Sequence, residues 1–434
     1  MEQHGKNPQQ NVVAIIPARY ASTRLPGKML REVAGLPLVL HTLGQAQKAQ
    51  LVSRVIVATD DQRIFDIVCA ANGEAVMTSP NHNSGSDRLA EVAAGLPEGS
   101  IIVNVQGDEP LISPDTIDSA VEALINDPSA DIATTCELIS HKQKELLNGN
   151  VVKVVTGDNG YALYFSRSPM PFPRAASLRW GGDPGKAIDN EPELLASFRK
   201  HTGLYVYRRE YLLKFTLLPQ TALEQIEMLE QLRALENGAK IKVVEVSQTS
   251  IGVDTEQDLE RVRILLEDIP ITYGEGSIDD VTETSSVYVD TVKRSFRCIY
   301  PDEYLDGLSI DSRKFASLER YSRKDYHLFT ARTKSGKLVG FADRGEPVLE
   351  GVNQKCQLYS IYVLPEYQDL GIGKALFRRC SDGVESLCLD TVEESPFRKF
   401  YQHLGGTIIG KGHHAFGDEE MDTVIYAWEG RMDT

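Results

Sequence analysis

The chain has 434 residues, with 46 Lys or Arg against 62 Asp or Glu, so its formal net charge is −16. At roughly 150 residues per domain this length predicts two or three domains. The acidic balance opposes non-specific binding to nucleic acid or to anionic membranes. With 41% hydrophobic and 25% charged residues, the composition is typical of a globular protein. We therefore expect small-molecule partners, no nucleic acid and no membrane.

Two further features predict a cytoplasmic location. The polar residues 1–10 do not resemble a signal peptide, and no apolar run approaches the roughly 20 residues that a membrane-spanning helix needs. The six cysteines are scattered, with no CxxC pair and no zinc-finger spacing. This usage favours buried free thiols in a reducing compartment.

From residue 12 to residue 268, short β-rich runs alternate with helical patterns. This alternation predicts a mainly parallel sheet with helices on both faces. The first three pairs are strands at 12–19, 54–61 and 100–110, followed by helices at 38–49, 62–73 and 115–127.

Further along the chain, Asp-Asn-Gly at 158–160 predicts a hairpin between strands at 151–157 and 161–166. A strand follows at 201–208. Leucines and glutamates at helical spacing then predict one long helix over 221–238, ending at Gly238.

The acidic residues 269–286 divide the chain. They lack apolar periodicity and contain Pro270, Gly274 and Gly276, which break regular structure. We expect a linker here, between one domain at 1–268 and a second at 287–434.

A cluster of basic residues follows the first strand. Arg19, Arg24 and Lys28 lie in a loop with Pro26 and Gly27, and ligands of open parallel sheets gather at the carboxyl ends of strands. The loop suits a polyphosphate, although three solvated surface cations are the alternative.

Two aspartates occur near other predicted strand ends. Asp108 lies near the end of the strand predicted at 100–110, and Asp254 precedes a helix. Carboxylates together with phosphate oxygens are ligands that Mg²⁺ prefers. Taken singly, Asp108 is a turn residue and Asp254 a neighbour of a helix cap. Together with the basic loop they favour a nucleotide-dependent transferase over a binding module.

Seven separated motifs in residues 11–265 resemble those of CMP-Kdo synthetases, the 3-deoxy-manno-octulosonate cytidylyltransferases. They are IIPARYASTRLPGK, SGSDRLAEV, VNVQGDEPLI, YFSRSPMPFPR, HTGLYVYR, LEQLRALENG and GVDTEQDL. The resemblance implies a glycosyltransferase-A-like α/β nucleotidyltransferase domain with a mainly parallel mixed sheet, usually a homodimer. Such enzymes couple CTP to the anomeric hydroxyl of 3-deoxy-manno-octulosonate (Kdo) and release pyrophosphate.

The resemblance also implies roles for individual residues. The nucleotide side comprises Arg19, Ser22, Arg24 and Lys28 at the triphosphate, Ser84, Asp87 and Arg88 toward the cytosine, and Asp108 and Asp254 as Mg²⁺ ligands. The sugar side comprises Gln106, Arg167, His201, Tyr205, Glu230 and Gln231. Of these, Arg19, Lys28, Asp108 and Asp254 are the expected catalytic residues.

The chemistry of the side chains fits several of these roles. Arg167 suits a carboxylate through paired hydrogen bonds, and we interpret His201 as a substrate contact rather than a base. For Glu230 and Gln231 the alternative is a solvated helix face. Thr202 departs from the family pattern, which leaves open 8-amino-Kdo, another ulosonic acid or a phosphonate as acceptor.

The C-terminal half contains a second glycine motif. Two strands joined at a Ser-Gly turn occupy 327–343, and a β-rich run at 358–363 leads to Gln368, Gly371 and Gly373 before a helix. Free N–H groups at a helix start bind pyrophosphate, although an ordinary strand-to-helix turn has the same pattern.

This region, with FRKFYQHLGG at 397–406, resembles GNAT-type N-acetyltransferases. The resemblance implies a GNAT α/β domain that holds acetyl-CoA through Val363, Gln368, Asp369, Leu370, Gly371, Ile372, Gly373 and Lys374. Tyr401 would be the general acid, with packing against Phe397 and Phe400 as its alternative. The general base stays open between Glu393, Glu394 and a water relay.

These observations predict a Mg²⁺-dependent cytidylyltransferase that uses CTP and is fused to an acetyl-CoA-dependent acetyltransferase, which acts on an amino group of a related acid sugar. Glu394 and Gly406 replace a usual Asn and Phe of the GNAT pattern. An inactive GNAT fold that serves assembly or sensing therefore remains the alternative.

Overall fold

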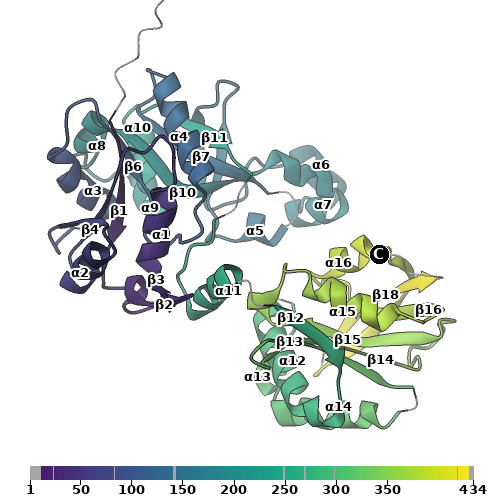
Figure 1. The fold of residues 1–434 in the computed structure, drawn as a ribbon. Coiled ribbons are helices and arrows are strands. Elements are labelled where there is room, and N and C mark those ends of the chain that lie inside the picture. The colour runs from purple at the N-terminus through teal and green to yellow at the C-terminus, as the bar shows by residue number, and fades with distance from the viewer. Residues whose placement is uncertain are drawn as a thin grey trace, which may run out of the picture. The chain divides into compact units, whose positions relative to one another are not determined.

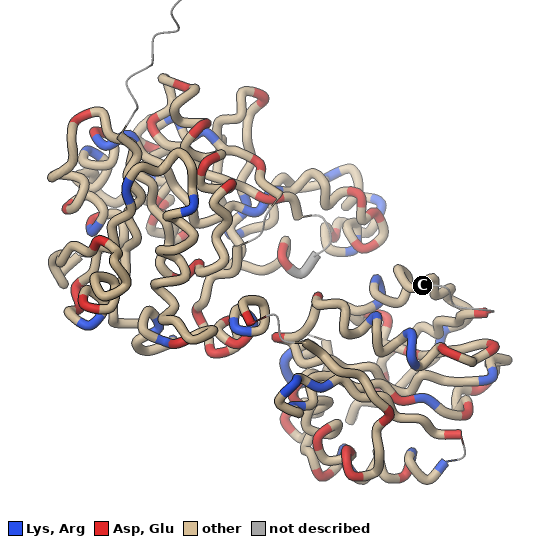
Figure 2. Tube along the Cα trace, viewed as in Figure 1, with Lys and Arg blue, Asp and Glu red and all other residues tan. Residues whose placement is uncertain are grey.

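The computed structural model describes residues 11–22, 24–82, 84–139, 143–247, 250–267, 270–297, 299–323, 325–417 and 419–429. The chain divides into two compact units, Met1–Leu266 and Glu267–Thr434 (Figure 1). Figure 2 shows both signs of charge distributed over each unit. Within the described ranges, no helix has the length and apolarity needed to cross a membrane.

The N-terminal unit is built on a mixed, mainly parallel sheet. The strand order is β11 (Ile241–Glu245), β7 (Ile132–Leu138), β10 (Arg199–Arg208), β6 (Ile101–Asn104), β1 (Val12–Ala18), β4 (Arg54–Thr59) and β5 (Glu74–Met77). Strand β10 runs antiparallel to both of its neighbours, β6 and β7, while the other pairs along this path are parallel. The predicted sheet type is confirmed.

Successive residues of β1 face opposite sides of this sheet, as the pleat requires. Val12, Ala14 and Ile16 join one core cluster, which includes residues of α1 (Leu38–Ala46), α2 (Gln62–Ala70) and α4 (Pro114–Asn126). Val13 and Ile15 join the other cluster, with residues of α3 (Gly85–Ala94) and α8 (Arg209–Phe215). Helices therefore cover both faces, as predicted, although α3 and α8 were not among the helices located from the sequence.

The remaining elements of this unit lie around the sheet. The predicted hairpin is confirmed as β8 (Lys153–Thr156) and β9 (Ala162–Ser166), which pair antiparallel. The others are η1 (Lys28–Leu30), β2 (Glu32–Val33), β3 (Leu36–Pro37), α5 (Gln143–Leu147), α6 (Arg174–Arg179), α7 (Pro184–Asn190), η2 (Pro192–Ser197) and α11 (Glu256–Glu267).

The single helix predicted over residues 221–238 is wrong. The structure has two short helices, α9 (Ala222–Glu227) and α10 (Glu230–Glu236), because Met228 between them adopts a left-handed φ of 56°. Glu224 of α9 is buried and pairs with Arg233 of α10 at 3.0 Å. The predicted helix end at Gly238 is confirmed, since this glycine has a left-handed φ of 81°.

The C-terminal unit has a seven-stranded sheet. Its order is β12 (Ile271–Glu275), β13 (His327–Thr333), β14 (Leu338–Gly345), β15 (Cys356–Val363), β16 (Ser386–Val392), β18 (Glu419–Glu429) and β17 (Thr407–Phe416). Neighbouring strands are antiparallel except β15 and β16. The helices are η3 (Ile278–Asp280), α12 (Val281–Ser295), α13 (Asp302–Gly307), α14 (Ile310–Tyr321), η4 (Pro365–Tyr367), α15 (Ile372–Ser381) and α16 (Arg398–His403).

The expected linker at 269–286 is wrong over the residues that the structure describes. Strand β12 pairs with β13 along its length, and α12 starts at Val281. The acidic residues are compatible with regular structure because they lie at exposed or ion-paired positions: Asp280 and Glu283 both contact Arg332. Residues 268 and 269 lie outside the described ranges.

Candidate active sites

Lys28 joins the two aspartates that the sequence singled out. Its Nζ donates hydrogen bonds to Asp108 Oδ2 at 2.6 Å, to Asp254 Oδ1 at 3.0 Å and to the carbonyl of Val253 at 2.8 Å. The lysine is buried, with 8% of its surface exposed. Two carboxylates from distant parts of the chain therefore converge on one cation. The sequence predicted both aspartates beside the basic loop, and their role as Mg²⁺ ligands stays a prediction.

The backbone holds this cluster together. Asp108 follows β6, and its carbonyl accepts a hydrogen bond from the Val253 N–H at 2.8 Å, which places Asp254 opposite. Arg24 pairs with the second oxygen of Asp254 at 2.8 Å. The turn before Lys28 needs glycine, because Gly27 has a φ of 65°.

The other predicted residues of this loop lie on its surface side. Arg19 is exposed at the end of β1. Ser22 accepts a hydrogen bond from the Leu25 N–H at 3.4 Å through its hydroxyl. Both remain available to a ligand at the carboxyl edge of the sheet.

The three residues expected toward the cytosine have structural partners. Ser84 and Asp87 cap α3 reciprocally, each side chain accepting a hydrogen bond from the other's backbone N–H at 3.2 Å. Arg88 is 4% exposed and pairs with Asp60 at 2.7 Å. These side chains position the start of α3.

A cavity of about 490 Å³ brings together most of the predicted sugar residues. Its wall includes Gln106, His201, Tyr205 and Gln231. Asp254 also lies on the wall, so the cavity and the Lys28 cluster share this residue, while Lys28 and Asp108 are not among the lining residues.

His201 is buried in this wall between two aromatic rings. Its ring centroid lies 5.1 Å from that of Phe165 and 5.2 Å from that of Tyr205. Burial lowers the pKa of the imidazole to about 3, so the ring is neutral at physiological pH. Its Nε2 lies 2.9 Å from the Thr134 hydroxyl. A neutral ring held in this way suits a substrate contact better than a proton acceptor.

Arg167 and Glu230 are not among the residues that line this cavity. The guanidinium of Arg167 donates to three backbone carbonyls, those of Glu227 at 2.7 Å, Gly149 at 3.1 Å and Met228 at 3.3 Å. Arg167 therefore stabilises the backbone between α9 and α10. Its placement does not support the expected role as a carboxylate clamp. Glu230 accepts a hydrogen bond from the Ser86 hydroxyl at 2.7 Å.

Three charged residues of the cavity wall were not predicted from the sequence. Lys200 pairs with Glu137 at 3.0 Å, and Glu109 lies on the same wall. Burial, together with the nearby Asp108 carboxylate, raises the pKa of Glu109 to about 7. Glu109 belongs to the QGDEP motif, but the pattern does not reveal that its side chain turns inward.

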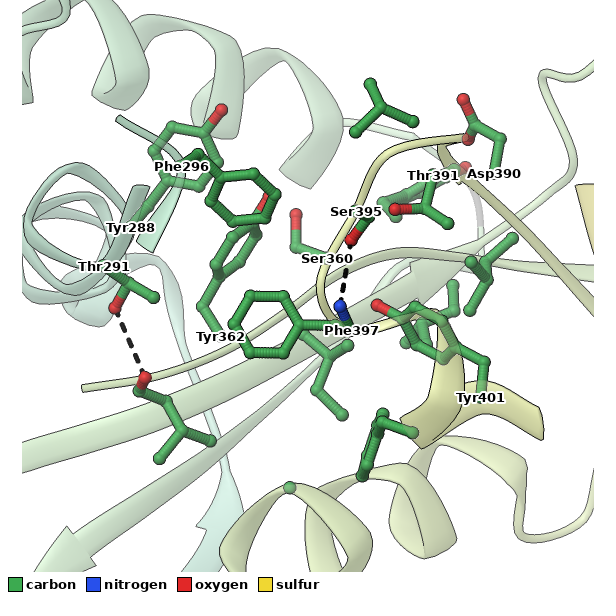
Figure 3. Close-up of a pocket in the computed structure, with 18 of the residues that line it drawn as sticks. Tyr288, Thr291, Phe296, Ser360, Tyr362, Asp390, Thr391, Ser395, Phe397 and Tyr401 are labelled. Atoms are coloured by element: carbon green, nitrogen blue, oxygen red, sulfur yellow. Dashed lines mark hydrogen bonds between the residues drawn. The ribbon is translucent and has the colours of Figure 1, made fainter. Parts of the chain in front are cut away.

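In the C-terminal unit a larger cavity opens between two parallel strands. β15 and β16 pair at Cys356 with Leu387 and at Gln357 with Cys388, and no later residues of the two strands are paired with each other. The cavity, of about 760 Å³, is lined by later residues of both strands. Figure 3 shows Tyr288 and Phe296 along one side and Asp390, Thr391 and Tyr401 along the other.

The glycine motif begins α15 beside this cavity. Asp369 and Gly371 have left-handed φ angles of 64° and 79°. Six of the eight predicted acetyl-CoA residues line the cavity: Val363, Gln368, Asp369, Gly371, Gly373 and Lys374. Leu370 and Ile372 are not among the lining residues, and Ile372 is buried.

Tyr401 lines the cavity and also packs in the core. Its ring contacts Tyr426 and Trp428, and burial raises the pKa of its hydroxyl well above the usual value, so the hydroxyl keeps its proton. Of the two predicted packing partners, Phe400 contacts Tyr401, with 5.4 Å between the ring centroids. The general-acid role stays a prediction.

The expected general bases are not on the cavity wall. Neither Glu393 nor Glu394 is among the lining residues, and Glu393 binds Lys411 at 2.9 Å. The structure instead places Asp390 of β16 there. Gly406 has a packing reason, since a Cβ at this position would lie 2.6 Å from Trp428.

The two folds and their sites define a nucleotidyltransferase unit joined to an acetyltransferase-type domain. Residues 13–241 match the family described as cytidylyltransferase, and residues 324–405 match the acetyltransferase (GNAT) domain. The match to the first family covers more than half of the chain.

Curated relatives narrow the family. The chain is 52% identical over 256 residues to the 3-deoxy-manno-octulosonate cytidylyltransferases of Trichlorobacter lovleyi and Geobacter sulfurreducens, across 58% of this chain and 97% and 98% of those proteins. The enzyme of that name from Geotalea daltonii is 53% identical over 257 residues, across 59% of this chain and 98% of its own length. The chain belongs to the 3-deoxy-manno-octulosonate cytidylyltransferase family and carries a C-terminal GNAT domain.

A solved structure agrees with this assignment. The chain is similar to a CMP:2-keto-3-deoxy-manno-octonic acid synthetase complexed with CTP, with 40% identity and a TM-score of 0.53. The similarity covers 60% of this chain and 99% of that protein.

Proposed function

We propose that the N-terminal unit transfers CMP from CTP to the anomeric hydroxyl of Kdo and releases pyrophosphate. The observation that carries the proposal is the convergence of Lys28, Asp108 and Asp254 beside a polar cavity that shares Asp254. The family membership supplies the substrates. Other acid acceptors remain the alternative, because Thr202 lies on the cavity wall.

In this reaction the sugar hydroxyl attacks the α-phosphorus in line, and negative charge develops on the oxygen that bridges to pyrophosphate. Lys28, Arg24, Arg19 and Ser22 bind the triphosphate and stabilise that charge. Ser84, Asp87 and Arg88 act indirectly, by holding the start of α3 toward the cytosine.

Asp108 and Asp254 would hold Mg²⁺. They fit a hard cation because both carboxylates reach the same ammonium group, at 2.6 and 3.0 Å, and carboxylate oxygens are ligands that Mg²⁺ prefers. Both oxygens of Asp254 are already paired, with Lys28 and with Arg24, so the metal would replace one of these two contacts. Bound Mg²⁺ supplies Lewis-acid stabilisation of phosphate charge and lowers the pKa of a coordinated hydroxyl.

The cavity side chains orient the sugar. Gln106, His201, Tyr205 and Gln231 contribute polar contacts without titrating near neutral pH. Arg167 and Glu230 support the wall from behind, through α9 and α10. We further propose that the enzyme is a cytoplasmic homodimer, which sedimentation of the purified chain tests.

We propose that the C-terminal unit transfers the acetyl group of acetyl-CoA to an amine of a related acid sugar. The amine nitrogen attacks the thioester carbon, the C–S bond breaks, and Tyr401 protonates the leaving thiolate while the amine proton passes to water. Val363, Gln368, Asp369, Leu370, Gly371, Ile372, Gly373 and Lys374 form the segment that holds the cofactor, mainly through backbone N–H groups at the start of α15.

The experiment is a substrate screen that reads pyrophosphate and free CoA side by side. CTP, Mg²⁺ and Kdo are expected to yield pyrophosphate, and acetyl-CoA with 8-amino-Kdo is expected to yield CoA. Pyrophosphate release with another ulosonic acid but not with Kdo would refute the sugar assignment. Failure to bind acetyl-CoA would leave an assembly or sensing role for the C-terminal unit.

A further inference from the structure

One end of the large C-terminal cavity is lined by three arginines, Arg313, Arg320 and Arg323. The lining also includes Lys374 at the start of α15 and two carboxylates, those of Asp369 and Asp390. The cavity therefore carries more positive than negative groups, although the chain as a whole has a net charge of −16. A local excess of cations in an acidic protein indicates an anionic ligand.

Arg313 is the most buried of these three arginines. It lies on α14 with 9% of its surface exposed, and its guanidinium lies over the Tyr288 ring, 3.9 Å from the centroid. One of its nitrogens donates to the Ser360 hydroxyl at 2.9 Å, while its buried Nε has no hydrogen-bond partner. Among the described residues, none of the recorded ion pairs involves Arg313. Burying a guanidinium with so few partners costs folding free energy, unless a ligand supplies the missing hydrogen bonds and negative charge.

The guanidinium of Arg320 donates a hydrogen bond to the same Ser360 hydroxyl as that of Arg313. Arg320 donates to the Ser360 hydroxyl at 3.0 Å, and it also lies 3.8 Å from Asp343. Asp343 thus compensates Arg320, so the pair of guanidiniums keeps one uncompensated positive charge. Two forked donors converging on one point are suited to a planar carboxylate.

This point is separate from the segment that binds the cofactor phosphates. Ser360 precedes Val363, the last residue of β15, by three residues, which at about 3.3 Å per residue places it roughly 10 Å back along the strand from the end that leads to the glycine motif. This separation favours the second substrate of the cavity, rather than the cofactor pyrophosphate, as the ligand of Arg313.

We propose that Arg313, with Arg320 and Ser360, binds the carboxylate of the acetyl acceptor, so that the GNAT domain selects amines that also carry an acid group. This inference rests on the proposed acetyltransferase function. It adds which part of the acceptor is recognised and by which residues.

The first test is calorimetry of the full chain saturated with CoA and titrated with 8-amino-Kdo. Sites in the N-terminal unit are common to all variants, so the wild type is expected to show a binding event that Arg313→Gln lacks. Arg378→Gln, an exposed arginine of α15 outside the cavity lining, is the matched control and is expected to keep the event. Identical isotherms for wild type and Arg313→Gln would overturn the proposal, as would the absence of any event in this cavity.

A second variant separates recognition from folding. Arg313→Lys keeps the charge but loses the fork, and we expect it to bind the acceptor at least about tenfold more weakly. The carboxamide of 8-amino-Kdo should lose a similar factor with the wild-type protein. Equal affinity for acid and carboxamide would refute carboxylate recognition without involving any variant.

The affinity for acetyl-CoA shows which anionic group Arg313 binds, the carboxylate of the acceptor or a phosphate of the cofactor. If Arg313 serves the acceptor, Arg313→Gln leaves the Kd for acetyl-CoA within about twofold of wild type. A loss comparable to the loss for the acceptor would assign Arg313 to a cofactor phosphate and contradict the proposal. Carboxylate-dependent binding without acetyl transfer would refute only the proposed acetyltransferase function, and transfer that ignores the carboxylate would refute only this inference.

Discussion

Replacing Lys28 by Met tests the cluster on which the cytidylyl site is built. The substitution keeps an apolar stem but removes an ammonium group that makes three hydrogen bonds, two of them to carboxylates. It leaves Asp108 and Asp254 facing each other with only Arg24 as a neighbouring cation. We therefore expect both the stability of the unit and its turnover to fall.

The expected loss of folding free energy depends on how exposed the three paired side chains are. Removing one partner of a fully buried ion pair costs about 3–5 kcal/mol. Here the side chain of Lys28 is 10% exposed, but those of Asp108 and Asp254 are 27% and 43% exposed. Solvent screening reduces the expected loss to about 1–3 kcal/mol. For a unit of this size that corresponds to a Tm lower by about 3–8 °C.

The assay is scanning calorimetry of the ligand-free chain, with the transition of the N-terminal unit identified by its shift on adding CTP. The control is Arg24→Met, whose side chain is 66% exposed and whose loss should cost less than about 1 kcal/mol. Turnover of Lys28→Met should fall about 10²- to 10³-fold. A Lys28→Met variant no less stable than Arg24→Met, with turnover within about threefold of wild type, would refute this reasoning.

Three further predictions concern the metal, a buried acid and the second site. Asp254→Asn should reduce pyrophosphate release at least about 10²-fold and remove its response to added Mg²⁺, and an unchanged metal titration would count against the ligand role. Because burial raises the pKa of Glu109 to about 7 in the folded chain, its contribution to stability is present below about pH 4 and is lost as the pH rises through 7. In EDTA, Glu109→Gln should therefore gain stability over wild type at pH 8 but not at pH 4, and calorimetry showing equal differences at both would contradict the assigned burial. Tyr401→Phe should slow acetyl transfer about 10²-fold or more while acetyl-CoA binding is kept, whereas a normal rate would leave Tyr401 as a packing residue.

The sequence predicted the parts of the fold that depend on local pattern. Alternating strands and helices predicted the mainly parallel sheet, and Asp158, Asn159 and Gly160 predicted the hairpin. The antiparallel direction of strand β10 was not predicted from this pattern. The position of Asp108 beside the basic loop was also predictable, because β1 and β6 are parallel neighbours whose carboxyl ends meet at one edge.

Other features depended on contacts that no local pattern reveals. Acidic residues suggested a linker, but Asp280 and Glu283 are paired with an arginine on β13. The leucine spacing over α9 and α10 continues across Met228, whose left-handed φ ends the helix. Arg167 has the chemistry of a carboxylate clamp, yet three carbonyls occupy its guanidinium. Arg313 was missed because only the tertiary fold buries it beside Ser360.

The central claim is that the N-terminal unit joins CMP to Kdo. Its most direct test is incubation of the full chain with CTP, Kdo and Mg²⁺, with mass spectrometry of the sugar product and quantification of pyrophosphate. The account predicts CMP-Kdo and pyrophosphate in equal amounts, and neither product in EDTA. Absence of CMP-Kdo under these conditions, while another acid acceptor is converted, would contradict it.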